Sequence, residues 1–205
     1  MDGGVGILSR ASRASGAMLI QHDPRFEMLR DRFVTAIRRD RGGAIWAVSQ
    51  LGIYRLERGR QEAQSVPFPS GNPWMAAMDT EGFLWVATRQ GTLDVIDTAT
   101  ERVTPAALPR GRHVEFIGPS PDRGVVVTFE NGASAFFTTR GPDGPIAMSP
   151  GPERITWLSV LSLLKMGDLY LAAHGGDRLS QIRLATGVVE QTILTSADLE
   201  DSDFR

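Results

Sequence analysis

The sequence predicts an all-β fold, because short β-rich runs alternate with turn residues along most of the chain. In the stretch 79–97, Asp79 and Gly82 form one turn, residues 83–88 are rich in β-branched and aromatic side chains, Gln90 and Gly91 form the next turn, and a second such run follows. No stretch keeps a 3.6-residue apolar period past three turns, so we expect no helix.

The same stretch is repeated along the chain at a nearly constant spacing. Trp46 and Trp85 lie 39 residues apart, each preceded by an aspartate at the same distance, and two fainter copies place Val126 and then Tyr170 at the equivalent position. A repeat of about 40 residues, with several strands in each copy and glycine at fixed offsets, is typical of a β-propeller blade. Such a unit cannot bury its own apolar face, so it must stack on its neighbours.

The predicted architecture is therefore a partial β-propeller of about four four-stranded antiparallel blades plus a half blade. We expect the half blade at residues 1–21 and the blades at about 33–68, 74–107, 113–149 and 155–194, with residues 34–37, 74–78, 114–117 and 156–160 innermost. The strands are predicted at 5–9 and 17–21; at 33–38, 44–49, 52–57 and 62–68; at 74–78, 83–88, 92–97 and 102–107; at 113–118, 124–129, 133–138 and 146–149; and at 155–163, 168–173, 179–184 and 188–194. Residues 22–32 are expected to form a long polar connection.

A closed ring of six to eight blades needs on the order of 250 to 340 residues. With 205 residues, the chain is expected to be a propeller region that is incomplete at both ends. The alternative is a small five-bladed ring closed by the N-terminal half blade, although the matching inner strands are missing near the C-terminus.

The best copy, DTEGFLWVATRQGTLDVID at 79–97, resembles the two-component regulator propeller repeat. In that family an Asp, a nearby Gly, a Leu-Trp-Val strand and a Gly-Leu strand recur in each blade, and the first copy here follows the pattern with Ser49 in place of threonine. The resemblance implies a non-catalytic, periplasmic sensor region of a bacterial membrane-bound signal transducer, either a hybrid histidine kinase or a diguanylate cyclase. Its partners would then be the remainder of its own propeller, its output domain, and a ligand or a second copy of the chain.

Composition excludes several other functions. The net charge of −2 gives no electrostatic case for nucleic acid, and the absence of cysteine excludes disulfides and thiolate chemistry. The longest apolar stretch, around residues 157–164, is too short for a membrane segment. Neither the three histidines nor the acidic stretch 198–203 has the spacing of a metal site, so no metal and no cofactor is predicted.

The recurring residues have structural explanations. We expect Trp46 and Trp85 to pack between adjacent blades. Asp40, Asp79 and Asp122 are each followed closely by glycine, which favours aspartates that cap backbone N–H groups in turns over catalytic or metal-binding carboxylates.

A candidate ligand site follows from the strand assignment. If the strands of each blade are named A to D from the inside outward, the D-to-A and B-to-C connections emerge on one face of a propeller. These connections carry aromatic, arginine and amide side chains, which suit a sugar-like or carboxylate-bearing ligand, and Trp74, Arg89 and Arg112 are its expected centre. The predicted ligand-binding residues are Trp74, Arg89, Gln90, Arg112, His113, Asn131, Arg154, Trp157 and His174.

Three other functions stay open on the sequence. The signal can pass by homodimerisation of propellers without a small ligand, or the face can be a protein-interaction scaffold. The third alternative is a propeller enzyme similar to streptogramin lyases or lactonases, which have a similar blade pattern. The clustered histidines and glutamate that such an enzyme requires are not apparent in the sequence.

Overall fold

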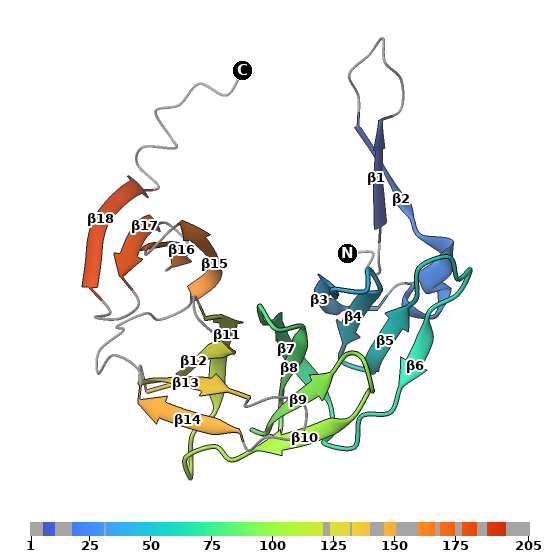
Figure 1. Ribbon diagram of the computed structural model, residues 1–205. Coiled ribbons are helices and arrows are strands. Elements are labelled where there is room, and N and C mark those ends of the chain that lie inside the picture. The colour runs from blue at the N-terminus through green and yellow to red at the C-terminus, as the bar shows by residue number, and fades with distance from the viewer. Residues whose placement is uncertain are drawn as a thin grey trace.

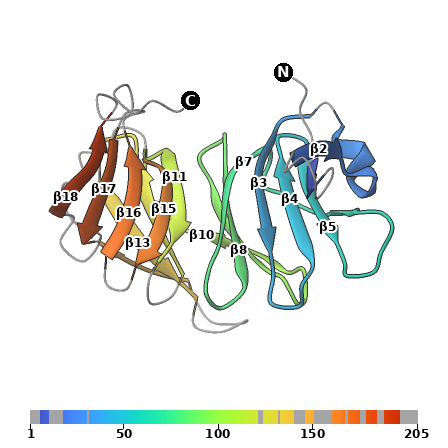
Figure 2. The same cartoon turned by 90° about the horizontal axis from the view of Figure 1, so that it is seen from above.

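The computed structural model describes residues 6–10, 18–30, 32–120, 124–131, 133–139, 146–150, 160–166, 169–174, 178–183 and 188–195, with side chains placed for those between 23 and 148. It contains four four-stranded antiparallel sheets and one two-stranded sheet. Figure 1 shows the four larger sheets side by side along an arc, and Figure 2 shows the same sheets seen from above. The predicted partial β-propeller is confirmed.

Each of the four larger sheets is one blade, with its strands A to D in chain order. Blade 1 holds β3 (Val34–Arg39), β4 (Ile45–Ser49), β5 (Gly52–Leu56) and β6 (Gln64–Val66); blade 2 holds β7 (Pro73–Met78), β8 (Phe83–Thr88), β9 (Leu93–Asp97) and β10 (Val103–Ala106). Blade 3 holds β11 (Val114–Pro119), β12 (Val125–Phe129), β13 (Ser134–Thr138) and β14 (Ala147–Pro150); blade 4 holds β15 (Val160–Met166), β16 (Leu169–His174), β17 (Arg178–Arg183) and β18 (Val188–Thr195). The two-stranded sheet pairs β1 (Gly6–Arg10) with β2 (Met18–His22).

The A strands form the inside of the arc, as the sequence predicts. Strand β7 contacts both β3 and β11, and β11 contacts β15. The D strands β6, β10, β14 and β18 lie on the outside (Figure 1). Proline 105 is tolerated in β10 because this edge strand has a neighbour, β9, on one side alone within its sheet.

The core lies between blades. Trp46 of blade 1 is fully buried with Ile53 against Leu84 and Ile96 of blade 2. A repeat later, Trp85 is fully buried against blade 3, with its ring centroid 6.4 Å from that of Phe137. The predicted packing of these tryptophans between blades is confirmed.

Each buried tryptophan is bonded to the aspartate that precedes it in the repeat. Asp40 accepts a hydrogen bond from the Trp46 indole N–H at 2.8 Å and another from the Ala44 backbone N–H at 2.8 Å. Asp79 accepts from the Trp85 indole at 2.8 Å and from the backbone N–H of Phe83 at 2.9 Å. One carboxylate therefore satisfies both the A-to-B turn and the buried indole. Asp122 lies outside the described residues.

The expectation of no helix is wrong at one place. A 3-10 helix, η1 (Pro24–Leu29), follows β2, with Asp23 as its N-cap and proline in its first turn. Phe26 and Leu29 are fully buried. They pack against Ala47, Leu56 and Ala63 on the side of blade 1 that faces away from blade 2. A six-residue helix is too short to show an apolar period, which is why the sequence analysis missed it.

Two further strand predictions needed correction. Strand β15 continues to Met166, beyond the predicted end at residue 163, and the predicted start of that strand at residues 155–159 lies outside the described residues. Strand β6 spans three residues instead of the predicted 62–68, since Pro67 lacks the N–H needed to extend the ladder. In the described part of the chain, no helix is long and apolar enough to cross a membrane.

Candidate functional site

The D-to-A and B-to-C connections of blades 2 and 3 are joined by backbone hydrogen bonds. In blade 2 the Arg89 N–H donates to the Asn72 carbonyl at 3.1 Å, and in blade 3 the Glu130 N–H donates to the His113 carbonyl at 3.2 Å. The two connections therefore lie on one face in each blade, as the strand assignment predicted. We call this face, where the sequence predicts ligand binding, the ligand face.

A β-bulge recurs at the start of every A strand. In blade 2 Pro73 pairs with Thr88 and Met75 pairs with Ala87, so Trp74 is the extra residue and has no partner across the ladder. The register shifts at the equivalent place in β3, β11 and β15. A bulge turns its extra residue away from the regular alternation of the strand, and this local geometry presents Trp74 at the ligand face.

Arg89 stacks on Trp74. The guanidinium carbon of Arg89 lies 4.1 Å from the centroid of the Trp74 ring, within the range of a cation–π interaction. Trp74 is half-buried and Arg89 is exposed. A stacked guanidinium keeps its N–H groups, which lie in its own plane, available to an incoming acceptor.

Gln90 closes the turn next to this pair. Its side-chain oxygen accepts from the Asn72 backbone N–H at 3.2 Å and lies 2.8 Å from the position that a Cβ on Gly71 would occupy. Gly71 has a φ of +105°, a conformation that favours glycine, and a larger residue there would also displace the end of the Gln90 side chain. The Gln90 side chain thus links the B-to-C turn to the D-to-A connection that precedes Trp74.

His113 connects blade 3 to blade 2. Its Nδ1 atom lies 3.1 Å, and the Arg112 carbonyl oxygen 4.0 Å, from the Cβ position of Gly91, which follows Gln90 in the B-to-C turn of blade 2. The predicted residues of the two blades therefore meet at this junction, which we call the blade 2–3 junction.

Arg112 lies against an aromatic ring of its own blade. Its guanidinium carbon lies 5.8 Å from the centroid of the buried Phe129 ring. Its Nη1 atom is buried and has no hydrogen-bond partner among the described residues. Arg112 therefore lies over an aromatic ring of its own blade, and its place in the predicted site stays a prediction.

The other predicted site residues are placed less fully. The Asn131 side chain accepts from the Ala133 N–H at 3.2 Å and so stabilises its own turn. His174 is the last residue of β16, where it pairs with Val160 and Arg178. Arg154 and Trp157 lie outside the described residues.

A buried carboxylate, Asp94, bonds residues next to the blade 2–3 junction. Asp94 is 1% exposed and accepts hydrogen bonds from Ser70 at 2.9 Å and Thr92 at 3.1 Å. Desolvation by burial raises the pKa of Asp94, while the hydrogen bonds from these two hydroxyl groups oppose the shift. Ser70 precedes Gly71 in the D-to-A connection, so this network fixes the loop that carries Asn72 and Trp74.

Sequence reasoning missed an apolar pair on the same face of blade 1. Phe33 is 63% exposed and Leu51 is 60% exposed. Phe33 comes directly before Val34, and Leu51 comes two residues after its partner Ser49; Asn72 and Gln90 have the same places relative to the Pro73–Thr88 pair of blade 2. An alignment of the repeats could have identified this pair, because it places Phe33 and Leu51 at the positions of two polar residues in the next blade.

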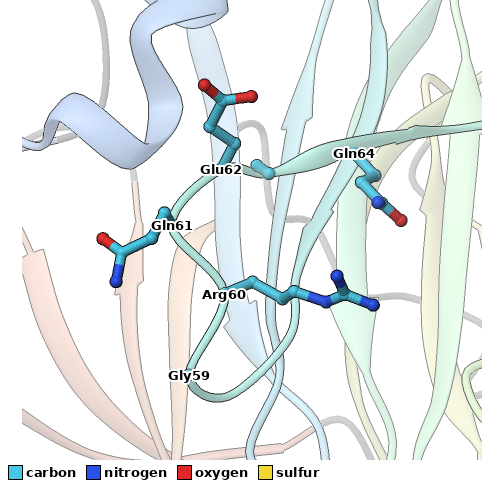
Figure 3. Close-up of a pocket in the computed structure, with 6 residues that line it drawn as sticks. Gly59, Arg60, Gln61, Glu62 and Gln64 are labelled. Carbon is cyan, nitrogen blue, oxygen red and sulfur yellow. The ribbon is translucent and has the colours of Figure 1, made fainter.

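The opposite face has different chemistry. It carries the Asp-Gly turns, and the Arg41 side chain of blade 1 donates there to the Thr80 carbonyl of blade 2. A hollow of about 450 Å³ lies apart from the predicted site, along the β5–β6 loop of blade 1, and is lined by residues 59–64. Figure 3 shows Arg60 and Gln61 pointing to opposite sides of this loop, so their polar groups do not converge on a ligand.

Comparisons with known proteins support the fold. No protein-family model matches the chain, and no curated protein sequence matches it. Among solved structures, catalytically inactive virginiamycin B lyase from Staphylococcus aureus with quinupristin is similar with a TM-score of 0.60 and 14% identity, over 91% of this chain and 62% of that one. Dihydro-heme d1 dehydrogenase NirN in complex with DHE gives a TM-score of 0.58 and 17% identity, over 80% of this chain and 37% of that one.

A chain of the mitotic checkpoint complex is also similar, with a TM-score of 0.59 and 11% identity, over 78% of this chain and 50% of that one. The chain thus spans between 37% and 62% of the length of these structures. Together with the four blades, the likenesses define the class of the protein, which is a β-propeller. At such identities they establish the fold and not the activity.

Proposed function

We propose that the chain is the sensor propeller region of a bacterial membrane-bound signal transducer, and that it binds a small polar ligand at the ligand face. The observation that carries the proposal is the Arg89–Trp74 pair, with 4.1 Å between the guanidinium carbon and the ring centroid. An indole stacks on the apolar face of a sugar ring, while arginine and glutamine side chains bond its hydroxyl groups. On this proposal the chain binds its ligand and does not convert it.

The kind of transducer comes from the sequence. The stretch 79–97 resembles the two-component regulator propeller repeat, whose members belong to histidine kinases and diguanylate cyclases with a periplasmic sensor. A fusion of the chain with its native upstream region to alkaline phosphatase, which is active outside the cytoplasm, tests the compartment. Activity of the fusion supports a periplasmic location, and an inactive but stable fusion contradicts it.

Calorimetric titration with a panel of neutral and acidic oligosaccharides tests the ligand site. We expect Trp74→Ala to weaken the binding of a panel member by about tenfold or more, because it removes both the stacking surface and the support of Arg89. Thr80→Ala on the opposite face is the matched control and should bind as the parent does. Equal affinities of the two variants would contradict the proposed site.

A second candidate is contact between two copies of the chain, and the exposed side chains of Phe33 and Leu51 favour it. If these residues hold a dimer, Leu51→Asp should convert it to a monomer in sedimentation velocity. A parent chain that sediments as a monomer at the highest soluble concentration argues against this candidate.

A propeller enzyme is the third candidate, and one contact favours it. The backbone bond from Glu130 to His113 brings an imidazole and a carboxylate onto the ligand face, and both are residue types used in acid–base catalysis. Incubation with quinupristin, with and without a metal chelator, tests it. Ring opening that the chelator abolishes would favour the enzyme over the sensor.

A further inference from the structure

The blade 2–3 junction holds arginines whose charge is not neutralised by a described partner. Some described arginines form ion pairs, such as Arg25 with Asp23 at 2.8 Å and Arg55 with Glu101 at 2.7 Å. Neither Arg89 nor Arg112 has an ion pair within the described ranges, and both guanidinium groups stack on aromatic rings instead.

Arg112 is the more unusual of the two. Its Nη1 is buried without a hydrogen-bond partner among the described residues, and an unsatisfied buried donor, above all a charged one, is unfavourable. Arg55 Nε is also unsatisfied, but that side chain bonds Glu57 and Glu101 through Nη1. For Nη1 of Arg112, no such acceptor is found in the described part of the chain.

The surrounding geometry holds Arg112 ready for an acceptor. Phe129 is 2% exposed and provides a rigid surface beneath the guanidinium. The loop is fixed on one side by the bond from the Arg112 N–H to the Pro109 carbonyl at 3.3 Å and on the other by the bond from Glu130 to the His113 carbonyl. A guanidinium whose plane is fixed by stacking presents paired N–H donors to a carboxylate, sulfate or phosphate.

The geometry points to an oxyanion subsite at the blade 2–3 junction, in which Arg112 binds the anionic group of a ligand whose ring contacts Trp74 and Arg89. This inference rests on the proposed ligand face and adds the chemical class of the ligand, an acidic sugar or a similar small oxyanion. Gly91 and His113, which are in contact across the junction, place the two arginines on either side of it.

Isothermal titration calorimetry on the 205-residue chain tests the subsite with four ligands that share one ring. Glucuronate, glucose 6-sulfate and glucose 6-phosphate are the anionic arms, and glucose is the neutral one. We expect at least one anion to bind about tenfold or more tightly than glucose, since charge-assisted hydrogen bonds are stronger than neutral ones. The preferred arm distinguishes carboxylate from sulfate and phosphate.

Two variants separate this subsite from general positive charge. Arg112→Met should weaken binding of the preferred anion by about tenfold, whereas Arg110→Met, in the same loop and with the same loss of charge, should weaken it by less than about twofold. Because Nη1 has no hydrogen-bond partner within the described ranges, Arg112→Met should melt within a few degrees of the parent.

The possible failures are distinct. Equal binding of anions and glucose by the parent overturns the subsite while the proposed sensor site stands, and this comparison needs no folded variant. Equal effects of Arg110→Met and Arg112→Met also overturn it, as does unchanged anion binding in a destabilised Arg112→Met variant, which would make Arg112 a structural residue. If none of the four monosaccharides binds, the subsite is overturned. The titration of the parent and Trp74→Ala with oligosaccharides then tests the proposed function separately.

Discussion

The two buried tryptophans show how a single residue serves the whole repeat. Each indole fills the space between two blades and donates its N–H to an aspartate of its own A-to-B turn. Packing and hydrogen bonding thus depend on the same side chain, which explains why aspartate and tryptophan recur together in the first two copies. In the third copy the equivalent residue, Val126, is also buried, at 1% exposed.

Replacing Trp85 should therefore be costly. We expect Trp85→Ala to lower the free energy of unfolding by about 3 to 5 kcal/mol, since it opens a cavity between blades 2 and 3 and leaves Asp79 without one of its donors. Trp74→Ala is the matched control and should cost about 1 to 2 kcal/mol, because that indole is half-buried. Urea denaturation of both variants measures the difference, and equal midpoints would exclude the core role of Trp85.

Asp94 should make stability depend on pH in the acid range. Its folded-state pKa is raised by desolvation, so the ionised form opposes folding at neutral pH and this cost is relieved as pH falls through the folded pKa toward the unfolded value of about 3.9. Asp94→Asn removes this dependence. Its stability relative to the parent should therefore be greatest near neutral pH and decline toward pH 4.

Carbon-detected NMR titration of the Asp94 carboxyl gives the same test directly. The hydrogen bond from Ser70 lowers the pKa of Asp94, so Ser70→Ala should raise it further. A titration midpoint at or below the ordinary value of about 3.9 would contradict the assigned burial.

At the scale of elements, the turns decide the fold as much as the strands do. Gly124 has a φ of +68°, and a Cβ there would meet the carbonyl of Phe137 in strand β13. Gly59 has a φ of +85° but has nothing within 4 Å of its Cβ position. A side chain at Gly59 would therefore cause backbone strain alone, whereas a side chain at Gly124 would cause both backbone strain and a steric clash.

We expect Gly59→Ala to cost about 1 to 2 kcal/mol, the strain of a left-handed conformation. Gly124→Ala should cost about 3 kcal/mol or more, because the β12–β13 pairing must also shift. Thermal denaturation of both variants tests this order. A Gly124→Ala protein as stable as Gly59→Ala would mean that the turn adopts another conformation.

Helix η1 is predicted to be a structural element of blade 1. Phe26→Ala should lower the free energy of unfolding by about 3 to 5 kcal/mol, because Phe26 is buried against Ala47, Leu56 and Ala63. Met28→Ala, in the same helix but 40% exposed, should cost about 0.5 kcal/mol or less. Similar losses in chemical denaturation would show that η1 does not pack on the blade.

The elements best predicted from the sequence are those with a repeated turn on each side. Strand β8 has the predicted bounds, because the Asp79 turn and the Gly91 turn both limit it. Helix η1 was missed because its only signals are an Asp-Pro start and two apolar residues three apart. The bulge at Trp74 was not predicted either, since it depends on pairing between strands and not on the residue itself.

The candidate site was predicted only in part. Strand order alone places Trp74, Arg89, Gln90 and His113 on one face. The stacking of Arg89 on Trp74 and of Arg112 on Phe129 depends on side-chain conformation, which has no sequence period. Propeller symmetry thus predicts which loops meet, and packing decides which of their side chains touch.

At the scale of the whole molecule, contacts between blades differ from face to face. On one face Arg41 bonds Thr80; on the outside Arg55 of blade 1 reaches Glu101 of blade 2, which holds a φ of +60°. On the ligand face the contact between Gly91 and His113 leaves arginine, glutamine and indole groups accessible. The blades are thus tied together at their turns and outer strands, while the ligand face keeps its polar groups available.

The most direct test of the central claim is backbone chemical-shift mapping of the isotope-labelled chain during titration with acidic and neutral glycans. If the ligand face binds a glycan, the backbone amide chemical shifts of Asn72, Arg89, Gln90 and His113 should change together and give one dissociation constant. Shifts confined to the A-to-B turns at residues 40–43 and 79–82, on the opposite face, would contradict it.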